Sequence, residues 1–173
     1  MNASAIAQRL ASSESAKRSV VKLLMFGMAT ALFSHGIPRS VSAQWIDNRI
    51  TLGNTVEPDP LILKGMSGGE VKATEIVKTE ETVTGFCNGF VDSKPNHVLV
   101  LSNFFDFLKI EIDSQTDTTI VVEGPGGVWC NDDSVDANPA IEGEWQPGKY
   151  KIWIGSYQED TNNSYLIKIT DKN

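Results

Sequence analysis

Histidine and cysteine are scarce in this chain of 173 residues, which contains two of each. Only one histidine, His97, falls after residue 43. Two cysteines and one histidine do not supply the four ligands of a typical structural zinc site. Residues 44–173 also lack a histidine paired with an activated nucleophile and lack a phosphate-binding loop. These absences argue against a zinc enzyme, a hydrolase with a catalytic triad and a P-loop protein.

Long hydrophobic runs are also missing, and positive charge is scarce after residue 43. No stretch approaches the roughly 20 apolar residues that span a bilayer, so we expect no stable membrane span. The whole chain carries a net charge of −7. Residues 44–173 hold 10 Lys and Arg against 21 Asp and Glu, a net charge of −11. Such a surface repels nucleic-acid phosphates, so we expect no nucleic-acid partner.

The first 43 residues have the layout of a cleavable signal peptide. Five basic residues and one acid surround the start of an uncharged run, Leu23–Phe33, which is followed by Pro38 and the small-residue sequence Val41-Ser42-Ala43. The sequence therefore predicts cleavage between Ala43 and Gln44, and an exported protein that is periplasmic or extracellular. The alternative is an uncleaved, amphipathic N-terminal helix.

Export changes the interpretation of the two cysteines. Cys87 and Cys130 both follow the predicted signal peptide, and an even pair in an oxidising compartment indicates a structural disulfide. Their sequence separation of 43 corresponds to a stabilisation of about 4 kcal/mol in the loop-entropy model.

The remaining 130 residues alternate apolar and polar positions with a period of two, and turn residues interrupt them every eight to twelve positions. Tyr150, Ile152 and Ile154 are expected on one face of a strand, with Lys151 and Trp153 on the other. With apolar content at 40%, the pattern predicts one all-β domain, an antiparallel β-sandwich or jelly roll of about eight strands over residues 61–173. Residues 44–60 are expected to form an extended lead-in outside the core. The expected strands are 61–64, 69–77, 84–91, 97–102, 106–112, 118–123, 150–155 and 164–170.

Several segments resemble the bacterial pre-peptidase C-terminal (PPC-like) β-sandwich domains. They are Asp117–Pro125, Cys130–Asp133, Asn138-Pro139, Gly148–Tyr150, Ile152–Tyr157 and Tyr165–Ile169, within a resemblance that covers residues 57–171. The resemblance implies a small secreted sandwich that accompanies exported hydrolases without being their catalytic part. Some domains of this family bind calcium, and some bind polymeric substrates or help secretion.

The acidic loop Cys130–Asn138 is the most chemically distinctive segment. Several carboxylates and amides on one loop are the oxygen ligands that Ca²⁺ prefers, and we name Asp132, Asp133 and Asp136 as candidate ligands, with Asp117 approaching from the strand before. The spacing does not match an EF-hand. The alternative is a solvated loop in which Asp and Asn side chains bond their own main chain.

Three other features have a chemical and a structural interpretation. Trp153 lies on the lysine-bearing face of its strand, so we expect it to be partly exposed and name it, with Asn138, as a candidate binding residue; the alternative is packing against a neighbour. Ser67 lies in a Gly-Met-Ser-Gly-Gly sequence like that of serine proteases, but the catalytic triad does not follow, and turn geometry at a hairpin alone explains the sequence. His97 is interpreted as a strand-edge residue rather than a base.

The sequence therefore predicts an exported, non-catalytic β-sandwich module that binds calcium, a cell-envelope polysaccharide or a secreted protein through its end loops. The alternative is a secreted hydrolase or its accessory subunit. An aromatic-lined cleft with two carboxyls roughly 5–10 Å apart would favour the hydrolase. A shallow loop surface with clustered oxygen ligands would favour the binding module.

Overall fold

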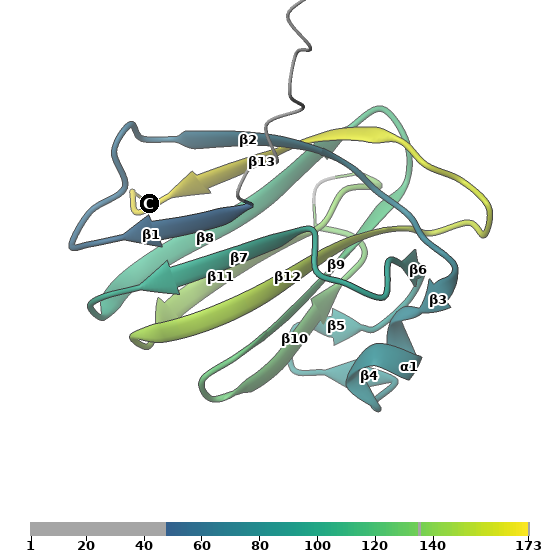
Figure 1. The fold of residues 1–173 in the computed structure, drawn as a ribbon, viewed down its shortest axis with the longest axis horizontal. Helices are drawn as coiled ribbons and strands as arrows, with labels where there is room; N and C mark the ends of the chain where they lie inside the picture. Colours follow the sequence, from purple (N-terminus) through teal and green to yellow (C-terminus); the bar gives the residue numbers. More distant parts are fainter. Residues whose placement is uncertain (1–47, 135, 173) are drawn as a thin grey trace, which may run out of the picture. The chain divides into compact units, whose positions relative to one another are not determined.

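The computed structural model describes residues 48–134 and 136–172, which form two β-sheets packed face to face with a small excursion on one side (Figure 1). The predicted signal peptide and its cleavage site at Ala43 and Gln44 lie outside the described residues. The elements are β1 (Arg49–Leu52), β2 (Leu61–Met66), β3 (Val71–Lys72), α1 (Ala73–Val77), β4 (Glu81–Thr82), β5 (Gly85–Phe86), β6 (Phe90–Val91), β7 (His97–Leu101), β8 (Phe105–Ser114), β9 (Thr118–Gly124), β10 (Gly127–Asn131), β11 (Ala140–Trp145), β12 (Gly148–Ser156) and β13 (Ser164–Thr170).

The strands confirm the predicted all-β sandwich. One sheet has the order β1-β7-β12-β9-β10, with β6 and β3 continuing beside the end of β12. The second sheet has the order β11-β8-β13-β2. All pairs are antiparallel except β1 with β7, and β4 pairs with β5 in a separate hairpin. In the described part of the chain, no helix is long and apolar enough to cross a membrane.

The inner faces of the two sheets carry the main core, because alternate residues along each strand point inward. On β12, Tyr150, Ile152 and Ile154 are each at most 1% exposed, as the alternation predicts. On β13, Tyr165, Ile167 and Ile169 are buried in the same way. The outer face of the second sheet is wet. An ion pair between Lys109 and Glu111 (2.9 Å) runs along β8, and one between Lys168 and Asp113 (2.8 Å) joins β13 to β8.

The outer face of the first sheet is covered instead, and this differs from the sequence-based expectation. Residues 71–91 fold over it and build a second small core from Ala73, Cys87, Val91, Val121, Cys130 and Trp153. Residues 69–77 were expected to form one strand, but only Val71–Lys72 does, and Ala73–Val77 forms α1. The helical spacing of Ala73, Ile76 and Val77 brings three apolar side chains onto this second core.

The expected lead-in also differs, because part of it belongs to the sandwich. β1 pairs with β7 in parallel, and the side chains of Leu52 and Val56 are 5% and 2% exposed in the main core. Residues 67–69 do not close a hairpin. They carry the chain from β2 in one sheet to β3 in the other, with Gly68 at φ 94° and Gly69 at φ 154°.

Candidate binding site

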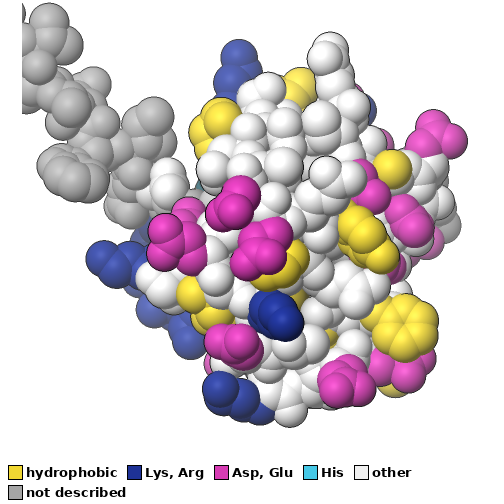
Figure 2. Space-filling view, turned by 90° about the vertical axis from the view of Figure 1, so that its right-hand side faces the viewer, with side chains coloured by type: hydrophobic (Ala, Val, Ile, Leu, Met, Phe, Trp, Pro, Cys, Tyr) yellow, Lys and Arg dark blue, Asp and Glu magenta, His cyan; other side chains and the backbone are white. Residues whose placement is uncertain are grey.

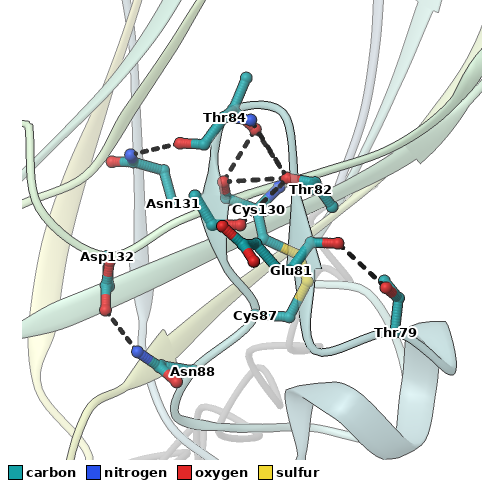
Figure 3. The surroundings of a disulfide bond; sticks show 10 residues. Thr79, Glu81, Thr82, Thr84, Cys87, Asn88, Cys130, Asn131 and Asp132 are labelled. Carbon is teal, nitrogen blue, oxygen red and sulfur yellow. Dashed lines mark hydrogen bonds between the residues drawn. A yellow bond between two sulfur atoms is a disulfide. The ribbon is translucent and has the colours of Figure 1, made fainter.

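The β4–β5 hairpin is fastened to β10 by the predicted disulfide, which the structure confirms between Cys87 and Cys130 (Figure 3). The hydroxyl of Thr84 donates to the main-chain oxygen of Cys130 over 2.8 Å, and the N–H of Cys130 donates to the hydroxyl of Thr82 over 3.0 Å. The side-chain amide of Asn131 donates to the main-chain oxygen of Thr84 over 2.9 Å. Covalent and hydrogen-bonded links therefore both fix this hairpin to the rigid sheet.

The tip of the hairpin projects an apolar side chain into solvent. Val83 is 96% exposed, and Phe86 on β5 is 53% exposed. Only Val83 and Thr84 separate the paired residues Thr82 and Gly85, so the turn is as tight as a β-hairpin allows. An exposed valine on a firmly held turn has no role in the core of this molecule.

A cleft of about 420 Å³ adjoins the hairpin tip. Its wall is aromatic. Trp129 on β10 stacks on Trp145 of β11 with ring centres 6.3 Å apart, and the ring centre of Tyr150 on β12 lies 4.9 Å from that of Trp145. Trp145 donates from its indole nitrogen to the oxygen of Leu108 over 2.9 Å. Tyr150 donates from its hydroxyl to the oxygen of Gln146 over 2.8 Å. Because their polar tips are bonded to the main chain, these two rings are held in place behind the half-buried Trp129.

The rim of the cleft is acidic. Glu142 and Glu144 of β11 line it, and both are exposed. Between them Gly143 has φ 144° beside an irregularity in the pairing of β11 with β8. A Cβ at Gly143 would meet no atom within 4 Å, so the floor of the cleft is open there. The described residues that line the cleft include no Lys, Arg or His.

Three of the four predicted metal ligands, Asp117, Asp132 and Asp133, lie near enough for their charges to interact. Burial raises the pKa of Asp117, and the charges of Asp133 and then Asp132 raise it further. One carboxylate oxygen of Asp117, Oδ1, is buried with no hydrogen-bond partner among the described residues. Asp132 accepts a hydrogen bond from Asn88 over 2.6 Å, and Asp136 is exposed. Within the described residues, no group of three or more Asp, Glu, His or Cys side chains could hold a metal ion.

Asn138 lies at the end of this loop, where both ends of its side chain are bonded within the chain. Its oxygen accepts from the hydroxyl of Thr118 over 2.9 Å, and its nitrogen donates to the oxygen of Ser114 over 2.9 Å. Asn138 therefore ties the acidic loop to the β8–β9 connection.

Trp153 is not partly exposed as its strand face suggested. It is 3% exposed, because α1 and the segment around Cys87 cover the outer face of β12. The alternative interpretation, packing against neighbours, describes its position. The alternation along β12 is as expected. What the alternation could not predict is that residues 71–91 cover the outer face of this strand.

His97 and Ser67 are also buried. His97 lies between β1 and β12 rather than at a sheet edge, is 4% exposed, and its Nε2 lies 3.0 Å from the hydroxyl of Tyr165. Burial lowers the pKa of His97, and burial and then the charge of Asp92 raise the pKa of Tyr165.

The hydroxyl of Ser67 lies 3.0 Å from that of Ser156, and both residues are at most 1% exposed. A polar hollow of about 450 Å³ adjoins His97. The Nε2 atom of His97 is, however, already hydrogen-bonded to the hydroxyl of Tyr165.

The face of the molecule on which α1, β3 and β6 lie carries acidic side chains next to hydrophobic ones (Figure 2). The sequence analysis named Trp153 as the candidate binding tryptophan, whereas Trp129 and Trp145 stack in the cleft and Trp153 belongs to the second core. Pro125-Gly126-Gly127, which closes the β9–β10 turn beside Trp129, and the glycine between Glu142 and Glu144 are the sequence signals of the cleft.

No protein-family model matches the chain. An uncharacterised protein of Synechococcus elongatus is 26% identical over 102 residues, which cover 57% of this chain and 66% of that protein. The chain thus spans just under two thirds of the length of this curated relative.

Two solved structures match this chain at low similarity. The pre-peptidase C-terminal domain of a collagenase from Bacillus anthracis has a TM-score of 0.43 and 11% identity, over 70% of this chain and 94% of that one. PliG of Aeromonas hydrophila, a periplasmic inhibitor of g-type lysozyme, has a TM-score of 0.37 and 11% identity, over 70% and 96%. Both TM-scores lie below 0.5, so neither likeness assigns a ligand to this chain. On the evidence of its own two sheets, the chain has the β-sandwich architecture that the resemblance to pre-peptidase C-terminal domains implies.

Proposed function

We propose that this chain is an exported, non-catalytic β-sandwich module that binds a partner protein through the β4–β5 hairpin and the adjoining aromatic cleft. The observation that carries the proposal is Val83, which is 96% exposed at the tip of a hairpin pinned by a disulfide. Export is supported by the signal-like leader and by the disulfide, which is typical of oxidising compartments.

A rigid apolar projection suits protein recognition. Binding loses part of its free energy to the ordering of loops, about 0.5–1.5 kcal/mol for each side chain that is immobilised. The links from Thr82, Thr84 and Asn131 to β10 hold the hairpin in one shape before any partner arrives. A convex apolar tip fits a pocket in a folded partner, whereas a polysaccharide chain needs a flat, open ring face.

The cleft does not support the hydrolase alternative, although it combines aromatic walls with two carboxyls. A glycosidase needs one carboxylic acid held in an apolar setting so that it stays protonated. Glu142 is 60% exposed at its side chain and lies 3.9 Å from Lys109, and Glu144 is exposed as well. The hydroxyl of Thr84 is bonded to the main chain of Cys130 and is not free to act as a nucleophile.

Affinity capture with matched variants tests this function. The full chain, purified with its disulfide intact, is used to retain proteins from an envelope extract of the source organism. Val83→Asp should abolish retention of the specific partner, while Phe104→Asp, which charges another exposed apolar residue at 42% exposure, should not. Equal retention by all three proteins, or no retained protein at all, would contradict the proposal.

Calcium binding by the acidic loop is a second, separate proposal. It is supported by Oδ1 of Asp117, which is buried without a hydrogen-bond partner among residues 48–134 and 136–172, beside the charges of Asp132 and Asp133. A cation there would relieve the repulsion, with main-chain oxygens and water completing its ligands. Thermal melting with calcium and with chelator tests it: we expect a higher midpoint with calcium that Asp133→Asn abolishes, and an unchanged midpoint would remove the proposal.

A further inference from the structure

We infer that the aromatic cleft receives an arginine side chain of the partner protein, stacked on Trp129 and paired with Glu142 and Glu144. This inference rests on the proposed binding function and specifies the chemistry of its partner. It is carried by the ring stack, by the unbalanced charge of the rim and by a related arrangement elsewhere in the same sheet.

The ring stack offers one accessible aromatic surface. Trp129 is half-buried, while Trp145 and Tyr150 behind it are 5% and 1% exposed. Gly126 borders the six-membered part of the Trp129 ring, and a Cβ there would lie 3.5 Å from the ring carbon Cη2. A larger residue at position 126 would cover this edge. Glycine at positions 126 and 143 leaves the ring and the cleft floor accessible to a flat group.

The rim offers negative charge with little local compensation. Lys109 lies 3.9 Å from Glu142 but is held more closely by Glu111, at 2.9 Å. In the described part of the chain Glu144 has no ion-pair partner. A cleft lined by two carboxylates and no cation attracts a positively charged group, and the net charge of −11 over residues 44–173 steers a basic partner toward it.

The first sheet already holds one of its own cations in a similar way. The ammonium of Lys151 lies 5.9 Å from the ring centre of Trp153 and 3.2 Å from a carboxylate oxygen of Glu123. The cleft presents the same combination of indole and carboxylate, and no Lys or Arg is among the described residues that line it. Arginine fits better than lysine, because its planar guanidinium stacks on a ring and pairs with a carboxylate through two parallel hydrogen bonds.

The competing occupant is a neutral sugar, which also stacks on tryptophan. Sugar sites combine hydrogen-bond donors with acceptors, since each hydroxyl group uses both. Here Glu142 and Glu144 only accept, the hydroxyl of Thr84 is already bonded to Cys130, and among the described lining side chains Gln146 supplies the amide. The charge of the rim therefore favours the guanidinium.

Calorimetric titration of the full chain with four probes tests the inference. The probes are a hexa-arginine peptide, a hexa-lysine peptide, a hexa-citrulline peptide of the same shape without charge, and a hexamer of N-acetylglucosamine. We expect hexa-arginine to bind most tightly and hexa-citrulline at least tenfold more weakly. The variant E142Q/E144Q should weaken hexa-arginine binding at least tenfold, and Trp129→Phe should weaken it severalfold.

The control variant E159Q/D160N removes the same charge from the β12–β13 loop, at the opposite end of β12 from the cleft. It should leave hexa-arginine binding within twofold of wild type. Equal losses in both double variants, equal binding of citrulline and arginine peptides, binding of the sugar hexamer alone, or no binding by any probe would each overturn the inference. If these outcomes occur and capture of a partner still depends on Val83, the arginine inference fails and the proposed function stands. If hexa-arginine binds but no partner is captured through Val83, only the proposed function fails.

Discussion

The hydroxyl of Thr84 donates to the main-chain oxygen of Cys130 over 2.8 Å, which joins the turn of the β4–β5 hairpin to the same residue that forms the disulfide. One residue of β10 thus anchors the hairpin through its side chain and through its main chain. The position of Val83 depends on this double attachment, and it can be tested one link at a time.

Replacing both cysteines with alanine should lower the free energy of unfolding by about 4 kcal/mol, because the bridge closes a loop of 43 residues. Denaturant unfolding of wild type and of Cys87→Ala/Cys130→Ala measures the difference. Reduction of the wild type should produce a similar loss and should leave the double variant unchanged. An unaltered unfolding midpoint in the variant would show that the bridge does not stabilise the fold.

Replacing Thr84 with valine should cost about 1 kcal/mol, since it removes a hydrogen bond but keeps the shape of the side chain. Thr84→Ser keeps the hydroxyl and should restore most of the loss. The two variants are compared by chemical denaturation. If valine and serine are equally stable, the bond to Cys130 does not hold the turn.

Replacing Gly65 with alanine should destabilise the protein by about 1–3 kcal/mol through overpacking. A Cβ at this position would overlap the phenol ring of Tyr165, which is 3% exposed and cannot move into solvent. In a double-mutant cycle, Tyr165→Phe should relieve part of the cost because it deletes the hydroxyl that the Cβ meets. If the changes in the free energy of unfolding caused by Gly65→Ala and Tyr165→Phe simply add, the two positions do not interact as this contact requires.

His97 should make the protein less stable as the pH falls below about 6.5. Burial lowers its pKa in the folded protein, so the unfolded chain takes up the proton first. The stability associated with neutral His97 is present above pH 6.5 and is lost as the pH falls through the lower, folded value. Unfolding curves between pH 7.5 and pH 5 should show a smaller loss for His97→Gln than for wild type, and equal slopes would contradict the assignment.

Asp117 should affect the pH dependence of stability in the opposite direction to His97, because burial and neighbouring acids raise its pKa. Its charged form is disfavoured in the folded protein, so its contribution to stability is greatest below its ordinary value of 3.8 and is lost as the pH rises through the folded value. Asp117→Asn should therefore be more stable than wild type at pH 7 without calcium. The advantage should disappear near pH 3, and a variant that is less stable at pH 7 would refute this account.

The sequence predicted the long strands well and the short ones poorly, for a physical reason. β7, β8 and β13 each alternate buried and more exposed positions over five or more residues, enough for period two to be visible. Ala73–Val77 shows the helical spacing only over five residues, which is too short to separate it from a strand. β1 was read as a lead-in because its burial depends on a parallel partner 49 residues later, which local alternation does not reveal.

By itself the sequence determined the fold class, the pairing of the two cysteines and the inward face of β12. These follow from local periodicity and from composition. Only the tertiary structure decided which outward-facing residues meet solvent: Trp153 is covered by α1, while Val83 is left 96% exposed. It also brought Trp129, Trp145 and Glu142 from two facing sheets to one cleft, because such contacts between sheets depend on how the sheets pack and not on the pattern within any strand.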